Sequence, residues 1–360
     1  MLEDFFSGKK VLVTGHTGFK GSWLSEMLLL SGSDVVGYSL PPNTEPNLFS
    51  ILDLKSQMKN HFADIRDYKK ALDIMKKEKP EIVIHMAAQP LVRDSYDDPV
   101  YTYETNLIGT VNVLQAMKEV GCAKAAVMIT TDKVYENKES GKPFKEEDRL
   151  GAHDPYSASK ACAEIAIQSY TNSFFNPETF GVSHNTLVAS ARAGNVVGGG
   201  DWSKDRLVPD MMKAFYEKKE VLVIRNPDAI RPWQHVLDPL YGYLLLAKSL
   251  HEGKKDLVGA WNFAPEEGNC ISVEAIVKKG IGSAPGSRYS IQRDPGKHEM
   301  KTLMLDASKA KKRLRWKPEF GIDHCLDWTF SWYERFYEKK EVMKDYTDKQ
   351  IRNFIEMKKG

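Results

Sequence analysis

An α/β fold with a doubly wound parallel sheet and a smaller C-terminal lobe is predicted by three observations. Short apolar runs rich in β-branched residues alternate with helical patterns over the first half of the chain. A glycine-rich turn stands between the first of these runs and the first helical pattern. After residue 193 the alternation ends, and prolines interrupt shorter elements. We therefore expect a first domain over residues 1–193 and a lobe over residues 194–360, from which segments can return to the first domain.

Each element of the first domain has its own signal. The runs at residues 81–88 and 124–131 are almost wholly apolar, which is typical of parallel strands buried on both faces of a sheet. A helical pattern ends at Gly121, the residue type that often terminates a helix. The expected strands are residues 9–15, 34–38, 81–88, 124–131 and 186–192, and the expected helices are residues 23–30, 67–79, 101–120 and 156–169. The charged segment 136–153 is expected to be an exposed loop, and a helical pattern returns from about residue 328.

Composition excludes several classes of protein. The 51 basic and 49 acidic residues leave a formal charge of +2, so no overall attraction to nucleic acid is expected. The 42% hydrophobic and 28% charged residues are those of a globular protein. Four scattered cysteines indicate neither a disulfide framework nor a metal site. The first residues lack the basic start of a signal peptide, and no apolar run approaches the roughly 18 to 20 residues of a membrane helix. We expect a cytoplasmic enzyme or binding protein without membrane partners.

The glycine-rich turn predicts a Rossmann-type dinucleotide site, because it joins a strand to a helix. Its glycines allow backbone N–H groups to approach a pyrophosphate at the helix N-terminus. The expected cofactor-binding residues of the turn are Gly15, His16, Thr17, Gly18, Phe19, Lys20 and Gly21. The second strand ends without the acidic residue that binds the ribose of NAD, and without an arginine for NADP, so these residues alone leave NAD and NADP open. Asp64 is either an acceptor for the adenine amino group or a solvated turn residue.

Tyr156 and Lys160 stand four residues apart, which places both on one face of a helix. An ammonium group in that position is expected to lower the pKa of the phenol. Thr131 stands at the carboxyl end of a predicted parallel strand, the edge at which ligands of such sheets gather. Together the three residues predict an acid/base apparatus beside the dinucleotide.

At this point the chain resembles the extended short-chain dehydrogenases/reductases. The resemblance covers about residues 8–320 and is carried by VTGHTGFKG, HMAAQ, TTDKVY and YSASK. Within that family HTGFKGSWL, TTDKVYEN, RAGNVVGGGDW and RPWQHV are similar to the branch of 4,6-dehydratases that act on CDP-D-glucose. Asp132 and Lys133 stand where related dehydratases of dTDP-glucose and GDP-mannose carry Asp-Glu, a pair that the epimerases of the family lack.

The resemblance implies NAD as cofactor and CDP-glucose as substrate. Its reaction oxidises C4 of the sugar, eliminates water across C5 and C6, and returns hydride to C6. The implied catalytic residues are Thr131, Asp132, Lys133, Tyr156 and Lys160. Asp132 is the candidate acid at C6, which requires a raised pKa. The C5 base is either a neutral Lys133 or Tyr156.

The resemblance also implies binding residues and an assembly. Ile65, Ala87 and Ala88 join Asp64 as cofactor neighbours, and Asn195, Arg206, Arg231, Gln234 and His298 are the expected substrate ligands. Arginines suit the substrate diphosphate, because a guanidinium group binds phosphate oxygens in pairs. Relatives pair through two helices that correspond to residues 101–118 and 156–170, so a homodimer or a dimer of dimers is expected. The competing functions are a sugar-nucleotide 4-epimerase or reductase, a 4,6-dehydratase of another nucleotide-linked hexose, and a catalytically idle NAD-responsive scaffold.

Overall fold

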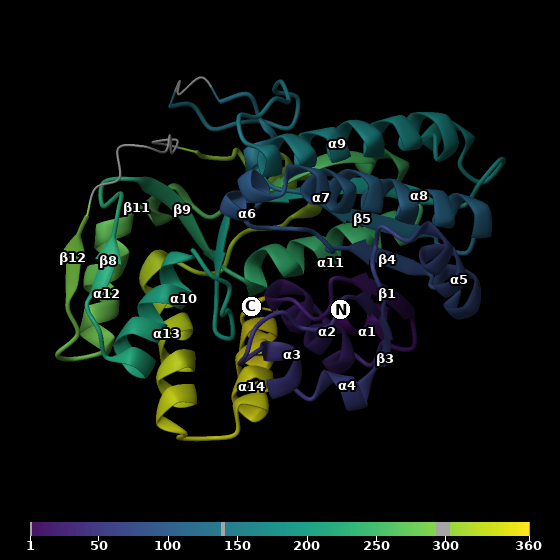
Figure 1. Ribbon diagram of the computed structural model, residues 1–360. Helices are drawn as coiled ribbons and strands as arrows, with labels where there is room; N and C mark the ends of the chain where they lie inside the picture. Colours follow the sequence, from purple (N-terminus) through teal and green to yellow (C-terminus); the bar gives the residue numbers. More distant parts are fainter. Residues whose placement is uncertain (1, 138–140, 293–302, 360) are drawn as a thin grey trace.

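The computed structural model describes residues 2–137, 141–292 and 303–359 (Figure 1). Its centre is a sheet in the strand order β10-β6-β5-β4-β1-β2-β3, and every pairing in it is parallel. The strands are β1 Lys10–Thr14, β2 Asp34–Ser39, β3 Lys59–Phe62, β4 Ile82–His85, β5 Ala125–Ile129, β6 Leu187–Ala193 and β10 Gly259–Phe263. The strand order reverses beside β1, which confirms the predicted doubly wound α/β fold.

Helices cover both faces of the sheet, and alternate strand residues serve the two layers. Val11 and Val13 of β1 belong to the core shared with one helix layer, whereas Leu12 belongs to the core shared with the other. The first layer contains α2 Phe19–Leu30 and α11 Leu237–His251, and the second contains α5 Tyr68–Glu78, α8 Gly109–Val120 and α9 Pro155–Phe174. Figure 1 shows α8 and α9 side by side above the sheet and α11 and α2 below it.

The helix expected over residues 101–120 is three consecutive segments. They are α7 Pro99–Tyr103, the π-helical turn η1 Glu104–Ile108 and α8, which ends at Gly121 as predicted. The π turn places Asn106 where its amide donates to the Ser159 hydroxyl of α9, at 2.9 Å. A π turn inserts one residue into the helical period, and such turns are frequent near functional sites.

The remaining chain forms a second lobe and supporting helices. Its small sheets have the orders β11-β9-β7 and β12-β8. These strands are β7 Asn195–Val197, β8 Leu222–Ile224, β9 Ile230–His235, β11 Cys270–Ser272 and β12 Tyr289–Ile291. The larger helices here are α10 Leu207–Met212 with the π turn η4 Lys213–Lys218, α12 Val273–Ser283, α13 Ile322–Glu338 and α14 Met343–Met357. The shorter segments are α1 Leu2–Phe6, α3 Leu48–Ile51, α4 Leu54–Gln57, α6 Val92–Asp97, η2 Asp132–Val134, η3 Pro177–Thr179, η5 Lys255–Leu257, η6 Glu267–Asn269 and η7 Ala310–Leu314. Strand β10 belongs to the main sheet, and helix α11 packs on that sheet. The division between domains at residues 193 and 194 stays a prediction.

The glycine-dense segment after β7 packs tightly against α2 and α13. A Cβ atom on Gly199 would lie 2.0 Å from the Trp332 ring, so only glycine fits there. The Gly199 carbonyl accepts a hydrogen bond from the Trp23 indole of α2, at 2.9 Å. The Tyr333 hydroxyl accepts from the Asp201 backbone N–H at 3.0 Å and donates to the Asp201 carbonyl at 2.6 Å. Helix α13 thereby fixes the loop that enters the candidate site.

Two kinds of feature are absent from the ranges that the structure describes. No helix there has both the length and the apolar character needed to span a membrane. In the same residues no cluster of three histidine, cysteine or acidic side chains is arranged to hold a metal ion.

Candidate active site

The three glycines of the turn after β1 lie in different structural environments. Gly15 has φ of +73°, and a Cβ atom on it would lie 2.8 Å from the Ala87 nitrogen. A Cβ atom on Gly21 would lie 2.1 Å from the Gly15 carbonyl oxygen. Gly18 is exposed, and a Cβ atom there would meet only that same oxygen, at 3.4 Å. Gly15 and Gly21 therefore serve internal packing, whereas Gly18 leaves the start of α2 open to a ligand.

His16 and Thr17 tie the glycine turn to the neighbouring strands. The His16 ring is buried, and its Nε2 lies 3.0 Å from the Asn60 Oδ1. A Cβ atom on Gly37 would lie 2.4 Å from that ring, so β2 needs glycine at this point. Burial lowers the pKa of His16 to about 4, which keeps the ring neutral at physiological pH. The Thr17 hydroxyl donates to the Leu40 carbonyl and lies 2.9 Å from the Ser39 hydroxyl, at the strand end where no acidic residue stands.

The predicted adenine neighbours follow β3. Arg66 donates to the Asp64 carboxylate from its backbone N–H, at 2.9 Å, and from its guanidinium group, at 2.8 Å. These hydrogen bonds lower the pKa of Asp64 and hold it ionised. Ile65 is buried against Gly109, where a Cβ atom would lie 2.8 Å from it.

Ala87 and Ala88 follow β4 and lie beside the glycine turn. The Ala87 N–H donates to the Thr14 hydroxyl, at 3.1 Å. His85, just before them, lies 2.7 Å from that hydroxyl and 3.1 Å from the Thr110 hydroxyl, and burial lowers its pKa to about 3. The imidazole is thus a neutral, hydrogen-bonded part of the interior, and Ala88 is the more exposed alanine.

Thr131 and Asp132 lie buried at the carboxyl end of β5. The Thr131 hydroxyl donates to the Asp132 carboxylate, at 2.9 Å. Asp132 is only 4% exposed, and burial raises the pKa of its carboxyl group against the opposing charge of Lys133. A carboxyl group in this state can carry a proton, as an acid catalyst must. Lys133 follows in the turn η2 and is partly exposed.

Helix α9 brings Tyr156 and Lys160 to the same strand end. The helix starts at Asp154, whose carboxylate accepts from the Ser157 N–H at 3.0 Å. The Thr131 hydroxyl acts on the pKa of the Tyr156 phenol, and Lys160 Nζ donates to the Ile129 carbonyl, at 3.1 Å. The sequence therefore predicted correctly that both residues share one helix face, and the structure shows that both are buried there.

The expected effect of Lys160 on the phenol is not seen. Burial raises the pKa of Tyr156 to about 12, and the influence of the Thr131 side chain offsets this only in part. Burial also lowers the pKa of Lys160 to about 8. The expectation of a lowered phenol pKa is thus wrong for this arrangement, because desolvation dominates and the ammonium group is directed at the Ile129 carbonyl.

A cluster of charges faces these residues from the glycine turn and the second lobe. Burial, followed by the positive charge of Arg206, lowers the pKa of Lys20 to about 8, while Asp132 opposes the shift. Arg206 donates to the buried Asp201 carboxylate, at 3.3 Å, and its charge also acts on Tyr156. The positive charge of Arg231, in β9, lowers the pKa of Asp132 and so opposes the effect of burial. The structure thus brings Lys20 and two predicted diphosphate ligands to the end of β5.

The other predicted substrate ligands are less closely associated with this cluster. Asn195 opens β7, where it pairs with Trp233, and is partly buried. Gln234 is fully buried in β9, and its amide donates to the Phe263 carbonyl at 3.2 Å, so its geometry gives no support to substrate binding. His298 lies outside the described residues. All three assignments stay predictions.

Sequence reasoning missed two buried acids. Asp201 holds Arg206, and Glu164 lies on α9 one helical turn beyond Lys160. The signal for Glu164 was available, because residues 156, 160 and 164 repeat the spacing of a single helix face. Asp201 carried no such local signal.

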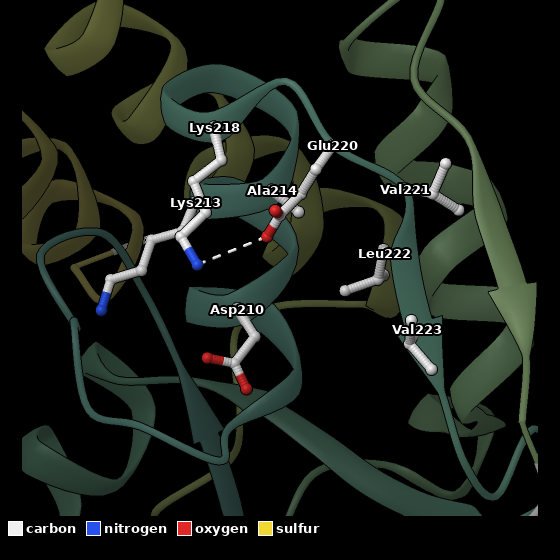
Figure 2. Close-up of a pocket in the computed structure, with 8 residues that line it drawn as sticks. All are labelled: Asp210, Lys213, Ala214, Lys218, Glu220, Val221, Leu222 and Val223. Atoms are coloured by element: carbon white, nitrogen blue, oxygen red, sulfur yellow. Dashed lines mark ion pairs between the residues drawn. The ribbon is translucent and has the colours of Figure 1, made fainter.

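A separate surface pocket of about 220 Å³ lies in the second lobe, along α10, η4 and β8 (Figure 2). Figure 2 shows Asp210, Lys213 and the Lys218–Glu220 ion pair at its wall, and that pair measures 3.3 Å. Lys213 donates to the Trp202 carbonyl, at 3.0 Å. The pocket contains none of the predicted site residues, so we place the candidate active site at the end of β5.

Comparison with known families identifies the family of the chain. A family model described as GDP-mannose 4,6 dehydratase matches residues 12–329, which include the glycine turn, the end of β5 and both helix residues. The chain belongs to this family. The resemblance to extended short-chain dehydrogenases/reductases is therefore confirmed.

Individual relatives refine the comparison. A CDP-glucose 4,6-dehydratase of Salmonella typhimurium is 46% identical over 343 residues, which cover 95% of each chain. A UDP-glucose 4-epimerase of Mycoplasma pneumoniae is 27% identical over 341 residues, covering 92% of this chain and 98% of the epimerase. A crystal structure of dTDP-glucose 4,6-dehydratase from Bacillus anthracis in complex with NAD has a TM-score of 0.74 at 22% identity, covering 92% of this chain and 98% of that one. The last comparison shows a shared fold, and the first confirms the resemblance to the CDP-D-glucose branch.

Proposed function

We propose that the protein is an NAD-dependent 4,6-dehydratase that converts CDP-D-glucose to CDP-4-keto-6-deoxy-D-glucose and water. The observation that carries the proposal is the buried Asp132 carboxyl group, hydrogen-bonded to Thr131 beside Tyr156. Loss of a hydroxyl group as water needs an acid, and the raised pKa of the buried Asp132 carboxyl group suits it to that role. The 46% identity to a CDP-glucose 4,6-dehydratase supports the same reaction and the same substrate.

The glycine turn fits a dinucleotide. Gly18 leaves space for a phosphate and gives α2 no side-chain cap, so backbone N–H groups at the helix start are suited to bind it. The buried His16 Nδ1 has no hydrogen-bond partner in the described part of the chain. The turn from Gly15 to Gly21 would hold the diphosphate side at Gly18 and the start of α2, Asp64 and Ile65 the adenine, and Ala87 and Ala88 the nicotinamide. When bound, NAD+ supplies a reversible two-electron acceptor for the hydrogen at sugar C4.

The proton of the C4 hydroxyl group goes to Tyr156 in this proposal. In this proposal Thr131 orients the phenol and the sugar oxygen, since its side chain already acts on the Tyr156 phenol. Lys160 contributes positive charge beside the developing phenolate. A phenol whose pKa is raised to about 12 is a strong base once it is ionised. Positive charge close to the phenol lowers its pKa and so favours this ionisation.

The elimination of water needs an acid, Asp132, and a base that removes the hydrogen at C5. Once C4 is a ketone, the hydrogen at C5 becomes acidic, and Asp132 donates its proton to the departing C6 hydroxyl group. The C5 base is Lys133 in one version and Tyr156 in the other. Solvent-deuterium entry at C5 in Lys133→Met decides between them, because a methionine side chain cannot remove a proton and unchanged exchange would therefore exclude Lys133.

The substrate diphosphate is assigned to Arg206 and Arg231. Both come from the second lobe and act electrostatically on the catalytic residues. Asn195 is assigned to the diphosphate or the sugar, and Gln234 and His298 remain proposed neighbours of the nucleotide.

A homodimer or dimer of dimers is part of the proposal. Four large apolar side chains are exposed along α7, η1 and α9, namely Val100 at 66%, Ile165 at 56%, Ile108 at 46% and Phe174 at 41%. These segments pack on one another, so the side chains can form one continuous patch of the kind that subunit interfaces bury. We also propose a cytoplasmic location, which the four free cysteines support.

A 4-epimerase is the second candidate, favoured by the 27% identity to a UDP-glucose 4-epimerase. Incubating the protein with NAD and separately with the CDP, dTDP, UDP and GDP hexoses, followed by mass spectrometry, separates the two. We expect CDP-glucose to lose the mass of one water, with Tyr156→Phe as the inactive control. A product of unchanged mass would favour the epimerase, and loss of water from another nucleotide only would correct the substrate.

A further inference from the structure

A buried carboxylate lies behind the catalytic pair on helix α9. Glu164 follows Lys160 by four residues and Tyr156 by eight, so all three lie on one helix face. Its Oε1 accepts from the Thr130 hydroxyl, at 2.5 Å, and from Arg192 Nε, at 2.8 Å. Its Oε2 accepts from the Ser190 hydroxyl, at 2.7 Å, and from Arg192 Nη2, at 2.9 Å. Four donors thus hold one carboxylate in a single position.

Arg192 extends this contact into the rest of the sheet. It is 3% exposed, and its Nη1 donates to the Tyr135 hydroxyl at 2.6 Å and to the Glu146 carbonyl at 3.2 Å. Tyr135 in turn donates to Asn262 of β10, at 2.8 Å. These contacts of the guanidinium group are all with other parts of the protein. They link β6, β10 and the loop before α9.

The helix meets the end of β5 at two consecutive residues. Lys160 donates to the Ile129 carbonyl, at 3.1 Å, and Glu164 accepts from the Thr130 side chain. Thr131, the partner of Tyr156, is the next residue. Since β5 is extended and α9 is rigid, these two contacts set the distance between Tyr156 and Thr131.

Glu164 also balances the charge of Lys160. Burial lowers the pKa of Lys160, and Glu164 opposes this. The hydrogen bonds from Arg192, Thr130 and Ser190 keep the pKa of Glu164 itself low, so the carboxylate stays ionised.

We propose that Glu164 is a positioning residue, which fixes α9 on the end of β5 through Thr130 and keeps Lys160 charged within the buried site. This inference rests on the proposed function, because it concerns the same acid/base pair. A buried ion pair that only stabilises the fold makes a different prediction, since it would affect unfolding and leave the pH dependence of turnover unchanged.

The positioning part is tested by Thr130→Val, which keeps the side-chain shape and the Glu164–Arg192 pair. Turnover of CDP-glucose is expected to fall about tenfold or more with KM changed little, because a displaced helix affects the reacting geometry. The matched control is Ser190→Ala in the neighbouring strand β6, which removes a hydrogen bond to the other carboxylate oxygen and leaves the Glu164–Thr130 contact in place, and it should keep wild-type turnover. Wild-type turnover in Thr130→Val would overturn the positioning part.

The charge part is tested by Glu164→Gln combined with Arg192→Met, which removes both buried charges and avoids an unpaired arginine. The alkaline limb of the turnover profile is expected to move to lower pH by about one unit, because an opposite charge near Lys160 is lost. A ¹³C NMR titration of Lys160 Cε measures the same shift without any substrate. An unchanged titration would overturn the charge part. If the double variant does not fold, Glu164→Asp replaces it, because the shorter side chain withdraws the carboxylate from Lys160. Lys160 should then titrate at lower pH than in the wild type, by less than in the double variant, and an unchanged titration would again overturn the charge part.

Failure of the inference and failure of the proposed function remain distinguishable. Wild-type protein that releases no dehydrated sugar nucleotide would contradict the proposed function, whereas the NMR titration would still report on Glu164. Active wild-type protein with variants indistinguishable from it would contradict the inference alone.

Discussion

Replacing Asp132 by asparagine is the sharpest test of the elimination step. The amide keeps the shape of the carboxyl group and can still accept from the Thr131 hydroxyl, 2.9 Å away in the wild type, so the fold should be unaffected. It cannot donate a proton as an acid. A positioned general acid contributes about 10²- to 10⁴-fold to a rate. Because Asp132 is 4% exposed, water has little access to replace it, and we expect the upper part of that range, about 10³- to 10⁴-fold or about 4 to 5.5 kcal/mol.

The assay must separate oxidation at C4 from loss of water. In a rapid-mixing experiment with CDP-glucose, the nicotinamide absorbance reports the first step and mass spectrometry of quenched samples reports the second. We expect Asp132→Asn to accumulate the oxidised sugar and to release water slowly. The matched control is Asp210→Asn, because Asp210 is another acid whose pKa burial raises, to about 6, but it lines the pocket of Figure 2. Wild-type dehydration by Asp132→Asn would refute the assignment of the acid.

The same variant makes a prediction about stability. Burial raises the pKa of Asp132 in the folded state above its value in the unfolded chain, so ionisation of this group destabilises the fold as the pH rises. Asp132→Asn should therefore be as stable as the wild type or more stable at neutral pH. The difference should vanish in acid, where the carboxyl group is protonated in both states.

Four further predictions concern the cofactor turn, the pH profile and the assembly. Gly21→Ala should destabilise the fold by about 2 kcal/mol or more in thermal unfolding, because its Cβ would lie 2.1 Å from the Gly15 oxygen. Gly18→Ala should change stability by less than about 1 kcal/mol yet weaken NAD binding in calorimetry by about tenfold, and equal affinities would exclude phosphate binding at Gly18. Wild-type turnover should fall as the pH rises through about 8, where Lys160 loses its proton, and a flat profile there would show that its charge is not required. Ile165→Asp should weaken self-association by about tenfold or more in analytical ultracentrifugation. The control is Val342→Asp, at an exposed residue just before α14, which should have no effect.

The sheet could be predicted because its signals are local. The runs at residues 81–88 and 124–131 became β4 and β5, and Gly121 ended its helix as expected. The π turn η1 was missed, because one inserted residue changes the apolar period too little to be seen in a single sequence. The short strands of the second lobe were missed because three-residue strands are defined by their partners, such as Asn195 opposite Trp233.

The candidate site was predictable only where spacing carried it. Tyr156 and Lys160 repeat at helical spacing, so a shared face followed from the sequence. The direction of Lys20 toward Asp132 and Arg206 depends on packing between the glycine turn and the second lobe, which no local pattern records. The pKa of Tyr156 was mispredicted because burial is a property of the whole fold.

The contact between Trp332 and Gly199 affects the order in which the enzyme can become competent during synthesis. A nascent chain still lacking α13 already contains the cofactor turn, β5 and the Tyr156 helix, but nothing yet clamps Asp201 through the Tyr333 hydroxyl. Arg206, which Asp201 holds, would be unanchored at that stage. Completion of the Arg206 side of the candidate site therefore waits for the ribosome to release α13, well after the glycine turn, β5 and α9 have been translated.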